Sequence, residues 1–179
     1  MIFLKLKILF ITLLTAAILF SSCAAPEIEI PKGMKLFSND LVEYTAFVPE
    51  KWVVSNKSAT ISAYASVSDA SSVVISSHPL GIEKSNYTAK DYWADHEKEL
   101  GSLLTDIEYS AKDKAKKLDK QDAMRYVYTA KLGETEYKYM QTVCIKDETV
   151  FLITYTSTPE LYAEHTEEIE KILDNFKFN

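Results

Sequence analysis

The sequence contains few of the residues from which catalytic and ligand-binding motifs are usually built. Its 179 residues include only four glycines, two cysteines and three histidines. It has no glycine-rich phosphate loop and no G-x-S-x-G motif of the kind found in hydrolases. The histidines, His78, His96 and His165, are far apart and form no zinc-binding pattern with each other or with cysteine. The sequence therefore predicts no cofactor, no metal site and no enzymatic activity.

Positive charge is also scarce. The chain has 20 lysines and arginines against 26 aspartates and glutamates, which gives a formal net charge of −6. Nucleic acids bind basic surfaces, so this balance argues against a nucleic-acid partner. The same excess of negative charge disfavours adsorption onto anionic lipid headgroups. Any attachment to a membrane is therefore expected to depend on a hydrophobic group.

Long hydrophobic runs are absent except near the N-terminus. There, Lys5 and Lys7 come before the apolar run ILFITLLTAAILF, residues 8–20. This run has the length of the apolar region of a secretory signal and is shorter than the roughly 20 residues of a membrane-spanning helix. The small residues Ser21 and Ser22 suit the peptidase that removes such signals. Cleavage is predicted to fall before Cys23.

The four residues around this site, Phe20-Ser21-Ser22-Cys23, resemble the bacterial lipobox, although that motif usually begins with leucine. The resemblance implies that residues 1–22 are a lipoprotein signal peptide and that Cys23 carries a diacylglyceryl group. Several acyl chains hold a protein durably at a bilayer. We therefore expect the chain to be anchored through its N-terminal lipid on the extracytoplasmic side of a cell membrane. Two alternatives stay open: an ordinary secretory signal beside an unmodified Cys23, and an uncleaved membrane anchor.

The stretch after Cys23 differs in composition from the rest of the chain. Residues 23–40 contain two prolines and a glycine and show no hydrophobic period. We interpret them as a flexible tether. The remainder, residues 41–179, has the length of one domain.

The domain shows the periods of both strands and helices. Turn residues separate its apolar runs, and Lys131-Leu132-Gly133-Glu134 and Lys146-Asp147-Glu148 are typical of hairpin turns. The order of elements is strands, helix, strands, helix, which predicts an α+β fold, and the last three strands, which these turns join, are expected to form an antiparallel ladder. The strand-like runs are residues 41–48, 52–55, 59–66 and 72–78 before the first helix, and 106–112, 123–132, 136–146 and 149–157 after it.

Two segments have helical signals. Thr88 and Asp91 form an approximate capping box at the start of the first, and Thr158 with Pro159 marks the start of the second. We expect the acidic residues of both helices to lie on solvated outer faces. The apolar stripe of the first helix comprises Tyr92, Trp93, His96, Leu100, Leu103 and Leu104, and that of the second comprises Leu161, His165, Ile169, Ile172, Leu173 and Phe176.

We expect the large apolar side chains of these elements to form one core. Cys144 lies in a strand-like run with no histidine nearby in sequence to activate it, so we interpret it as a buried structural cysteine rather than a nucleophile. The predicted core residues are Trp52, Trp93, Phe151, Ile153, Ile172 and Phe176.

Tyrosines are concentrated in the last strands. Alternation places Tyr126 with Tyr128, and Tyr137 with Tyr139, on common faces, and Tyr155 follows in the next strand. One interpretation is a sheet face covered by helices. The other is an aromatic surface for a protein partner, because tyrosine joins a large apolar ring to a polar tip.

The domain also resembles a known superfamily. Phe47, Pro49 and Trp52 form an F-x-P-x-x-W pattern, followed by the strand group, the Tyr/Trp-bearing helix and a terminal helix that ends on FKF. This combination is similar to the PsbP/Mog1 superfamily, and to its bacterial PsbP-like lipoproteins of unknown function, although many relatives have glycine where this chain has Lys51. The resemblance implies an antiparallel sheet with helices on both faces and a role in binding or assembly.

Three functional hypotheses follow. We favour a lipid-anchored, non-enzymatic module that binds or assembles another envelope protein. The alternatives are a carrier of a small apolar or peptide ligand and an envelope enzyme. A closed apolar pocket would favour the carrier, an exposed aromatic patch the binding module, and carboxylates or histidines that converge in a cleft the enzyme.

The predicted lipid anchoring at Cys23 can be tested directly. Changing Cys23 to Ser removes the thiol that would be acylated, and lipoprotein processing requires that acylation. We expect Cys23→Ser to accumulate as an unprocessed precursor without lipid label. Pulse labelling with a radioactive fatty acid measures this. Normal cleavage and release of the variant would contradict the lipoprotein assignment.

Overall fold

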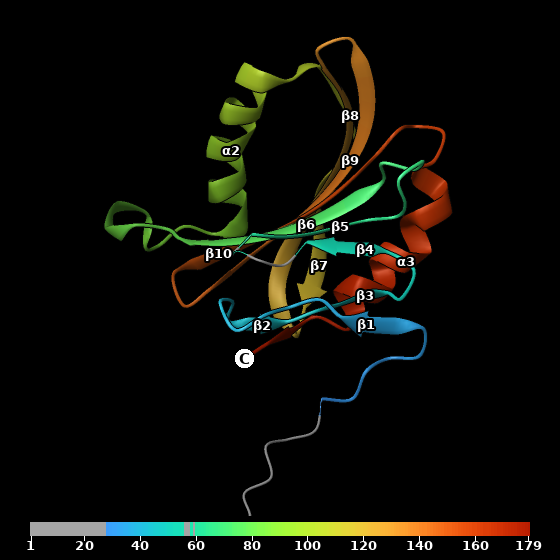
Figure 1. Cartoon of the computed structure of the whole chain (residues 1–179). Coiled ribbons are helices and arrows are strands. Elements are labelled where there is room, and N and C mark those ends of the chain that lie inside the picture. The colour runs from blue at the N-terminus through green and yellow to red at the C-terminus, as the bar shows by residue number, and fades with distance from the viewer. Residues whose placement is uncertain (1–27, 56–57, 59) are drawn as a thin grey trace, which may run out of the picture.

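A computed structural model describes residues 28–55, 58 and 60–179 (Figure 1). The predicted signal peptide and Cys23 lie outside the described residues. Among those described, seven strands form one antiparallel sheet, as the sequence predicts. In spatial order the strands are β4 (Val53–Ser55), β5 (Ile61–Tyr64), β6 (Ser72–Pro79), β10 (Thr149–Ser157), β9 (Thr135–Lys146), β8 (Gln121–Leu132) and β7 (Thr105–Leu118).

Tight turns join the four long strands. Gly133 has a φ of 64° between β8 and β9, while Asp147 and Glu148, with φ of 49° and 59°, turn the chain between β9 and β10. Positive φ at successive turn residues matches the twist of a two-residue hairpin. Both predicted hairpins are confirmed. Each strand in this part of the sheet therefore pairs with its neighbours in sequence.

The strand β7 is longer than the predicted run of residues 106–112. It covers 14 residues at the edge of the sheet, and its register shifts near Asp106 and Asp113, which have φ of 52° and 53°. Its second half is rich in lysine. Lysines and bulges are typical of edge strands because they discourage pairing with another chain. Because of these lysines and bulges, apolar and polar residues do not alternate clearly along β7. The full length of this strand was therefore not predicted from the sequence.

Helices cover both faces of the sheet. The helix α2 (Ala89–Leu103) lies against β7, β8 and β9, and α3 (Tyr162–Asp174) contacts β10 and β3 (Phe47–Pro49). Neighbouring residues of a strand point to opposite faces. On β9, Val143 belongs to the cluster under α2, whereas Cys144 belongs to the cluster on the α3 side. The domain therefore has two cores, one on each face.

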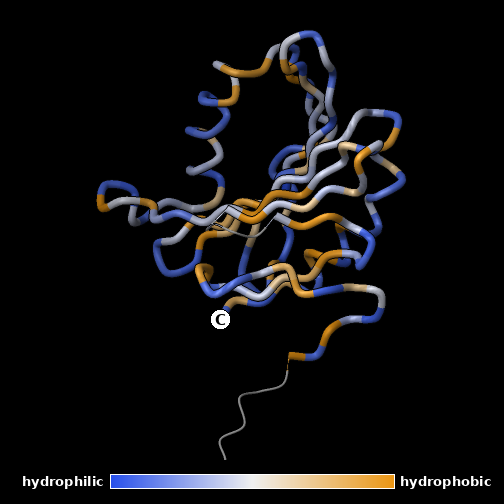
Figure 2. The backbone as a smooth tube through the Cα atoms, in the orientation of Figure 1, coloured by the Kyte–Doolittle hydropathy of each residue, from blue (hydrophilic) through white to orange (hydrophobic). Residues whose placement is uncertain are grey.

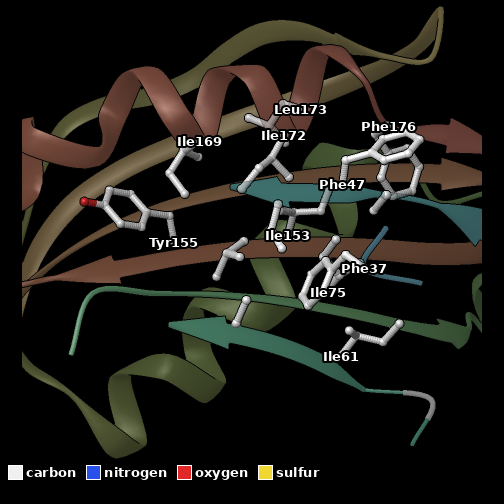
Figure 3. Packing of buried hydrophobic residues seen from close by; sticks show 14 of the residues in the cluster. Phe37, Phe47, Ile61, Ile75, Ile153, Tyr155, Ile169, Ile172, Leu173 and Phe176 are labelled. Carbon is white, nitrogen blue, oxygen red and sulfur yellow. The ribbon is translucent and has the colours of Figure 1, made fainter. Parts of the chain in front are cut away.

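The six predicted core residues are all buried, but not in one core. Trp93 lies in the cluster under α2, and the other five lie in the cluster on the α3 side. Figure 3 shows three of these five, Ile153, Ile172 and Phe176, in that cluster. Figure 2 shows the hydrophobic positions of the central strands alongside polar ones in the surrounding turns. The expectation of one core was wrong. Polar residues are interspersed with apolar ones along the strands, so the sequence pattern does not show that both faces of the sheet are buried.

The domain begins earlier than predicted. The strand β1 (Met34–Leu36) pairs with β3, and Phe37 is fully buried. Residues 34–40 therefore belong to the folded domain and not to the predicted tether, residues 23–40. The predicted strand over residues 41–48 is instead two short pieces, β2 (Tyr44–Thr45) and β3, which pair with β11 (Lys177–Phe178) and β1 respectively.

Of the two predicted helix starts, one is confirmed and the other is wrong. The capping box of α2 is confirmed, since the Asp91 N–H donates to Thr88 Oγ1 and the Thr88 N–H donates to the Asp91 carboxylate. By contrast, α3 begins at Tyr162 without a side-chain cap. Thr158 and Pro159 lie in a turn before it, where the Tyr162 N–H donates to the Thr158 carbonyl. Leu103, predicted on the apolar face of α2, is 70% exposed because it lies at the end of the helix.

Truncation of a buried isoleucine tests the core on the α3 side. Ile172 is fully buried, whereas Ile82, in the short 3₁₀ helix η2 (Ile82–Lys84), is 96% exposed. We expect Ile172→Ala to lower the free energy of unfolding by about 2–5 kcal/mol and Ile82→Ala to change it by less than about 0.5 kcal/mol. Urea denaturation of the full chain measures both. Equal effects of the two substitutions would contradict the assignment of the core.

Candidate functional site

A cleft lies between α2 and the end of β6. Its volume is about 190 Å³, which is below the roughly 300–1,000 Å³ of sites for drug-sized ligands. The cleft can accommodate a single chemical group rather than a whole large ligand. It is lined by His78, Pro79, Leu80, Lys84, Tyr92, Asp95, His96 and Glu99.

A hydrogen-bond chain fixes the orientation of His96 in this cleft. The Tyr128 hydroxyl donates to Gln141 Oε1 over 2.7 Å, and Gln141 Nε2 donates to Thr154 Oγ1 over 3.0 Å. The second Gln141 Nε2 proton is directed at His96 Nε2, which lies 3.5 Å away. His96 Nε2 therefore accepts, and the ring proton resides on Nδ1. Nδ1 lies 3.8 Å from Glu99 Oε2, so His96 presents a donor to the cleft.

The surroundings of His96 favour this neutral form. Burial lowers the pKa of His96 below its ordinary value, because a buried cation loses its hydration. Glu99 opposes this effect, and His78 adds to it, but the net direction is downward. At neutral pH the cleft thus holds an uncharged imidazole beside a carboxylate.

The two carboxylates of the cleft differ in their partners. Asp95 accepts hydrogen bonds from Lys84, Lys98 and Tyr87. The Lys84 contact is the largest of the causes that lower the pKa of Asp95 to about 2. Asp95 is therefore tied to its neighbours. Glu99 is 78% exposed, and its contact with the neutral His96 ring is long, 3.8 Å, so its carboxylate can accept a group from outside.

The structure brings together two histidines that the sequence did not relate. His78 lies one residue before the end of β6, close to the predicted strand end, and its ring centroid lies 5.6 Å from that of Tyr92. Tyr92 also stacks on His96 with centroids 5.7 Å apart. The spacing of Tyr92, His96 and Glu99 along one helix face was a usable signal, but nothing in the sequence placed His78 against it. Within the described ranges, no three histidine, cysteine or acidic side chains are arranged to hold a metal ion.

The five tyrosines considered as a partner surface do not form one. Tyr126, Tyr128 and Tyr155 are fully buried, Tyr139 is 9% exposed, and Tyr137 is half-buried. Four of them lie under α2, where Trp93 stacks on Tyr126 at a centroid distance of 3.7 Å and Tyr128 on Tyr139 at 5.0 Å, whereas Tyr155 lies on the opposite face. The interpretation of an aromatic surface is corrected: these rings mostly support the two helices.

Cys144 is buried and unpaired, as expected for a structural cysteine. Burial raises the pKa of its thiol to about 12, so almost none of it is thiolate at neutral pH. This thiol is not an activated nucleophile.

The acidic residues of α3 are not all on a solvated outer face, contrary to expectation. Glu170 accepts two hydrogen bonds from Arg125, the only arginine in the sequence, and one from Lys116. Glu168 accepts from the Trp52 indole N–H over 3.1 Å. A carboxylate next to a buried sheet face needs such donors, because burying it without them is costly. These contacts attach α3 to the sheet.

The arrangement of this sheet and its helices matches known structures. The solution structure of cyanobacterial PsbP (CyanoP) from Synechocystis sp. PCC 6803 aligns with a TM-score of 0.60 and 12% identity, covering 89% of this chain and 99% of that one. The chain has a PsbP/Mog1-like fold. No protein-family model matches the chain, and no curated protein matches it.

Two further structures, also of bacterial proteins, align with the chain. LpqN of Mycobacterium tuberculosis, described as involved in cell envelope biogenesis, has a TM-score of 0.58 and 13% identity over 82% of this chain and 90% of that one. PA94 of Pseudomonas aeruginosa, a protein of unknown function and putative regulator, has a TM-score of 0.53 and 16% identity over 77% and 92%. These likenesses establish the fold. No helix in the described part of the chain is long and apolar enough to cross a membrane.

The electrostatics of the cleft can be tested with one substitution. Glu99 is the nearby charge that favours the imidazolium form of His96. We expect Glu99→Gln to lower the pKa of His96 further, as measured by NMR titration of the histidine ring carbons. Glu97→Gln is the matched control, because Glu97 lies on the same helix but pairs with Lys112. A rise in the His96 pKa in Glu99→Gln would contradict the geometry.

Proposed function

We propose that the chain is a lipid-anchored, non-enzymatic module that binds another protein at the extracytoplasmic face of a bacterial membrane. The cleft between α2 and β6 is its contact site. A PsbP-like fold and an envelope-related structural neighbour, LpqN, support the cellular setting. The N-terminal signal and Cys23 supply the anchor.

The observation that carries the binding role is the small, rigid and chemically mixed cleft. His96 is fixed by Gln141, Asp95 is fixed by Lys84, and the Tyr92 ring is fixed between two histidines. A preorganised site loses little conformational freedom on binding. Its donors and acceptors suit a polar side chain that projects from a partner surface.

The two alternatives have less support in this geometry. A carrier of an apolar ligand needs an enclosed apolar cavity, whereas this cleft is small and five of its eight lining residues are charged or histidine. The enzyme hypothesis has one supporting feature, since histidines and carboxylates do converge here. However, Asp95 is already neutralised by Lys84, and no serine, threonine or cysteine lies among the lining residues to serve as a nucleophile.

Photocrosslinking in cells tests the proposal. A photoreactive amino acid replaces Glu99 in the full-length chain, and the control replaces Glu167 on α3, which has a similar exposure, 83% against 78%. We expect a discrete adduct with one envelope protein from position 99 and none from position 167. The adduct should disappear when His96→Ala is added.

Two results would reject this function. Identical adducts from both positions would indicate random proximity at the membrane. Turnover of a substrate by the purified chain, abolished by His96→Ala and retained in Glu167→Gln, would identify the cleft as an active site.

A further inference from the structure

His165 lies between two carboxylates that come from distant parts of the chain. Its Nε2 is 2.7 Å from Asp69 Oδ2, in the loop between β5 and β6, and its Nδ1 is 2.8 Å from Glu168 Oε2, one turn further along α3. The histidine side chain is 9% exposed. An ionised carboxylate only accepts hydrogen bonds, so both ring nitrogens must donate. This geometry fits the imidazolium ion and not the neutral ring.

Other contacts hold both carboxylates in place. Asp69 Oδ1 accepts from the Ser71 N–H over 2.9 Å. Glu168 accepts from the Trp52 indole N–H and pairs with Lys51 at 3.1 Å. Trp52 also packs edge-on against the His165 ring at a centroid distance of 5.4 Å. The imidazolium thus connects the β5–β6 loop, the β3–β4 turn and α3.

The charges of this cluster balance only when His165 is protonated. The groups that face one another are His165 and Lys51 on the positive side and Asp69 and Glu168 on the negative side. The Tyr155 hydroxyl nearby donates to a backbone carbonyl and stays neutral. When the imidazolium loses one of its two ring protons, a single ring N–H remains to donate to two carboxylates. One of the two bonds must then break, and the carboxylates repel each other.

We propose that His165 is a pH-dependent lock that holds the β5–β6 loop and the β3–β4 turn against α3 while protonated and releases them when it loses its proton. The lock is distinct from the cleft under α2, which lies on the other face of the sheet. It does not depend on the binding function proposed above.

The direction of the pH dependence follows from the surroundings. Burial alone would lower the pKa of His165, but its hydrogen bonds and charge interactions with Glu168 and Asp69 outweigh burial and raise it. A raised pKa means that the stabilisation is fully present below the unfolded value of about 6.5 and is lost as pH rises through the folded value. The pKa values of Asp69 and Glu168 are lowered, so the lock persists in mild acid. The lock is therefore released by a rise in pH and not by a fall into mild acid.

Release would alter two neighbouring parts of the surface. Glu168 lines a shallow cleft of about 170 Å³ with Lys32, Gly33 and Met34, where the N-terminal segment meets the domain. Asp69 lines a small cavity of about 20 Å³ with Tyr137 and Leu161. The lock therefore connects the attachment point of the anchor segment with the loop beside Tyr137. On an exported protein these groups would experience the external pH.

Because the chain has only three histidines, NMR can observe the lock directly. The full chain is purified in detergent with isotope-labelled histidine, and His78→Gln and His96→Gln assign the ring signals. We expect His165 to show the imidazolium signature at pH 7, with both ring protons, and to titrate above His96. A neutral His165 at pH 7 would overturn the proposal.

Hydrogen exchange then tests the release. After correction for the intrinsic pH dependence of exchange, we expect amides of residues 66–71 and of the first turns of α3 to exchange several-fold faster at pH 9.5 than at pH 6. In His165→Gln and in the milder Asp69→Asn, exchange should already be fast at pH 6 and change little with pH. His96→Gln is the control and should behave like wild type. An unchanged wild-type exchange pattern between the two pH values would overturn the lock even if His165 is charged.

Discussion

The fold depends on a sheet that is buried on both faces. On each inner strand, one residue points toward α2 and the next toward α3, so Val143 and Cys144 lie in different cores although they are adjacent. A polar side chain on such a strand has no direct route to water, so most of its hydrogen bonds must come from protein groups. Gln141 and Arg125 are the clearest examples, since they are 4% and 9% exposed. Their partners, His96 and Glu170, come from the helices that cover the two faces.

This constraint explains why the polar groups of interest lie where helix meets sheet. The cleft owes its fixed histidine to Gln141, and α3 is attached to the sheet by ion pairs with Glu170 and to the adjacent loops by those with Glu168 and His165. Removing one member of such a pair leaves the other buried without a partner, which costs more than the pair contributed. The polar contacts are therefore part of what makes the position of each helix unique.

Much of the fold could be predicted from the sequence because its signals are local. The Thr88–Asp91 capping box and the turns at Gly133 and at Asp147 each depend on a few consecutive residues, and all three are confirmed. The predicted start of α3, at Thr158 and Pro159, was wrong because these two residues also suit a turn. The strand β1 was missed because three residues show no period, and its pairing with β3 becomes visible only in three dimensions.

The candidate sites could not be predicted to the same extent, and the two buried histidines show why. His96 and His165 occupy equivalent positions on the apolar stripes of two amphipathic helices. One faces an amide that donates to it, and the other faces two carboxylates that accept from it. The first environment lowers the pKa and the second raises it. Asp69 is 96 positions from His165, and Gln141 is 45 from His96, so no local pattern distinguishes the two cases.

The strand β10 shows how close the two sites are and why they remain separate. Thr154 accepts from Gln141 on the α2 side, while the next residue, Tyr155, donates to the Tyr162 carbonyl at the start of α3. The two side chains share a backbone but no polar partner. A close-packed interior transmits strain, and the shared β10 backbone is the route by which a change at one of these side chains can reach the opposite face. Since β10 is paired with β9 along its whole length and with β6 over residues 149–156, we expect substitutions at His96 and His165 to have additive effects on stability.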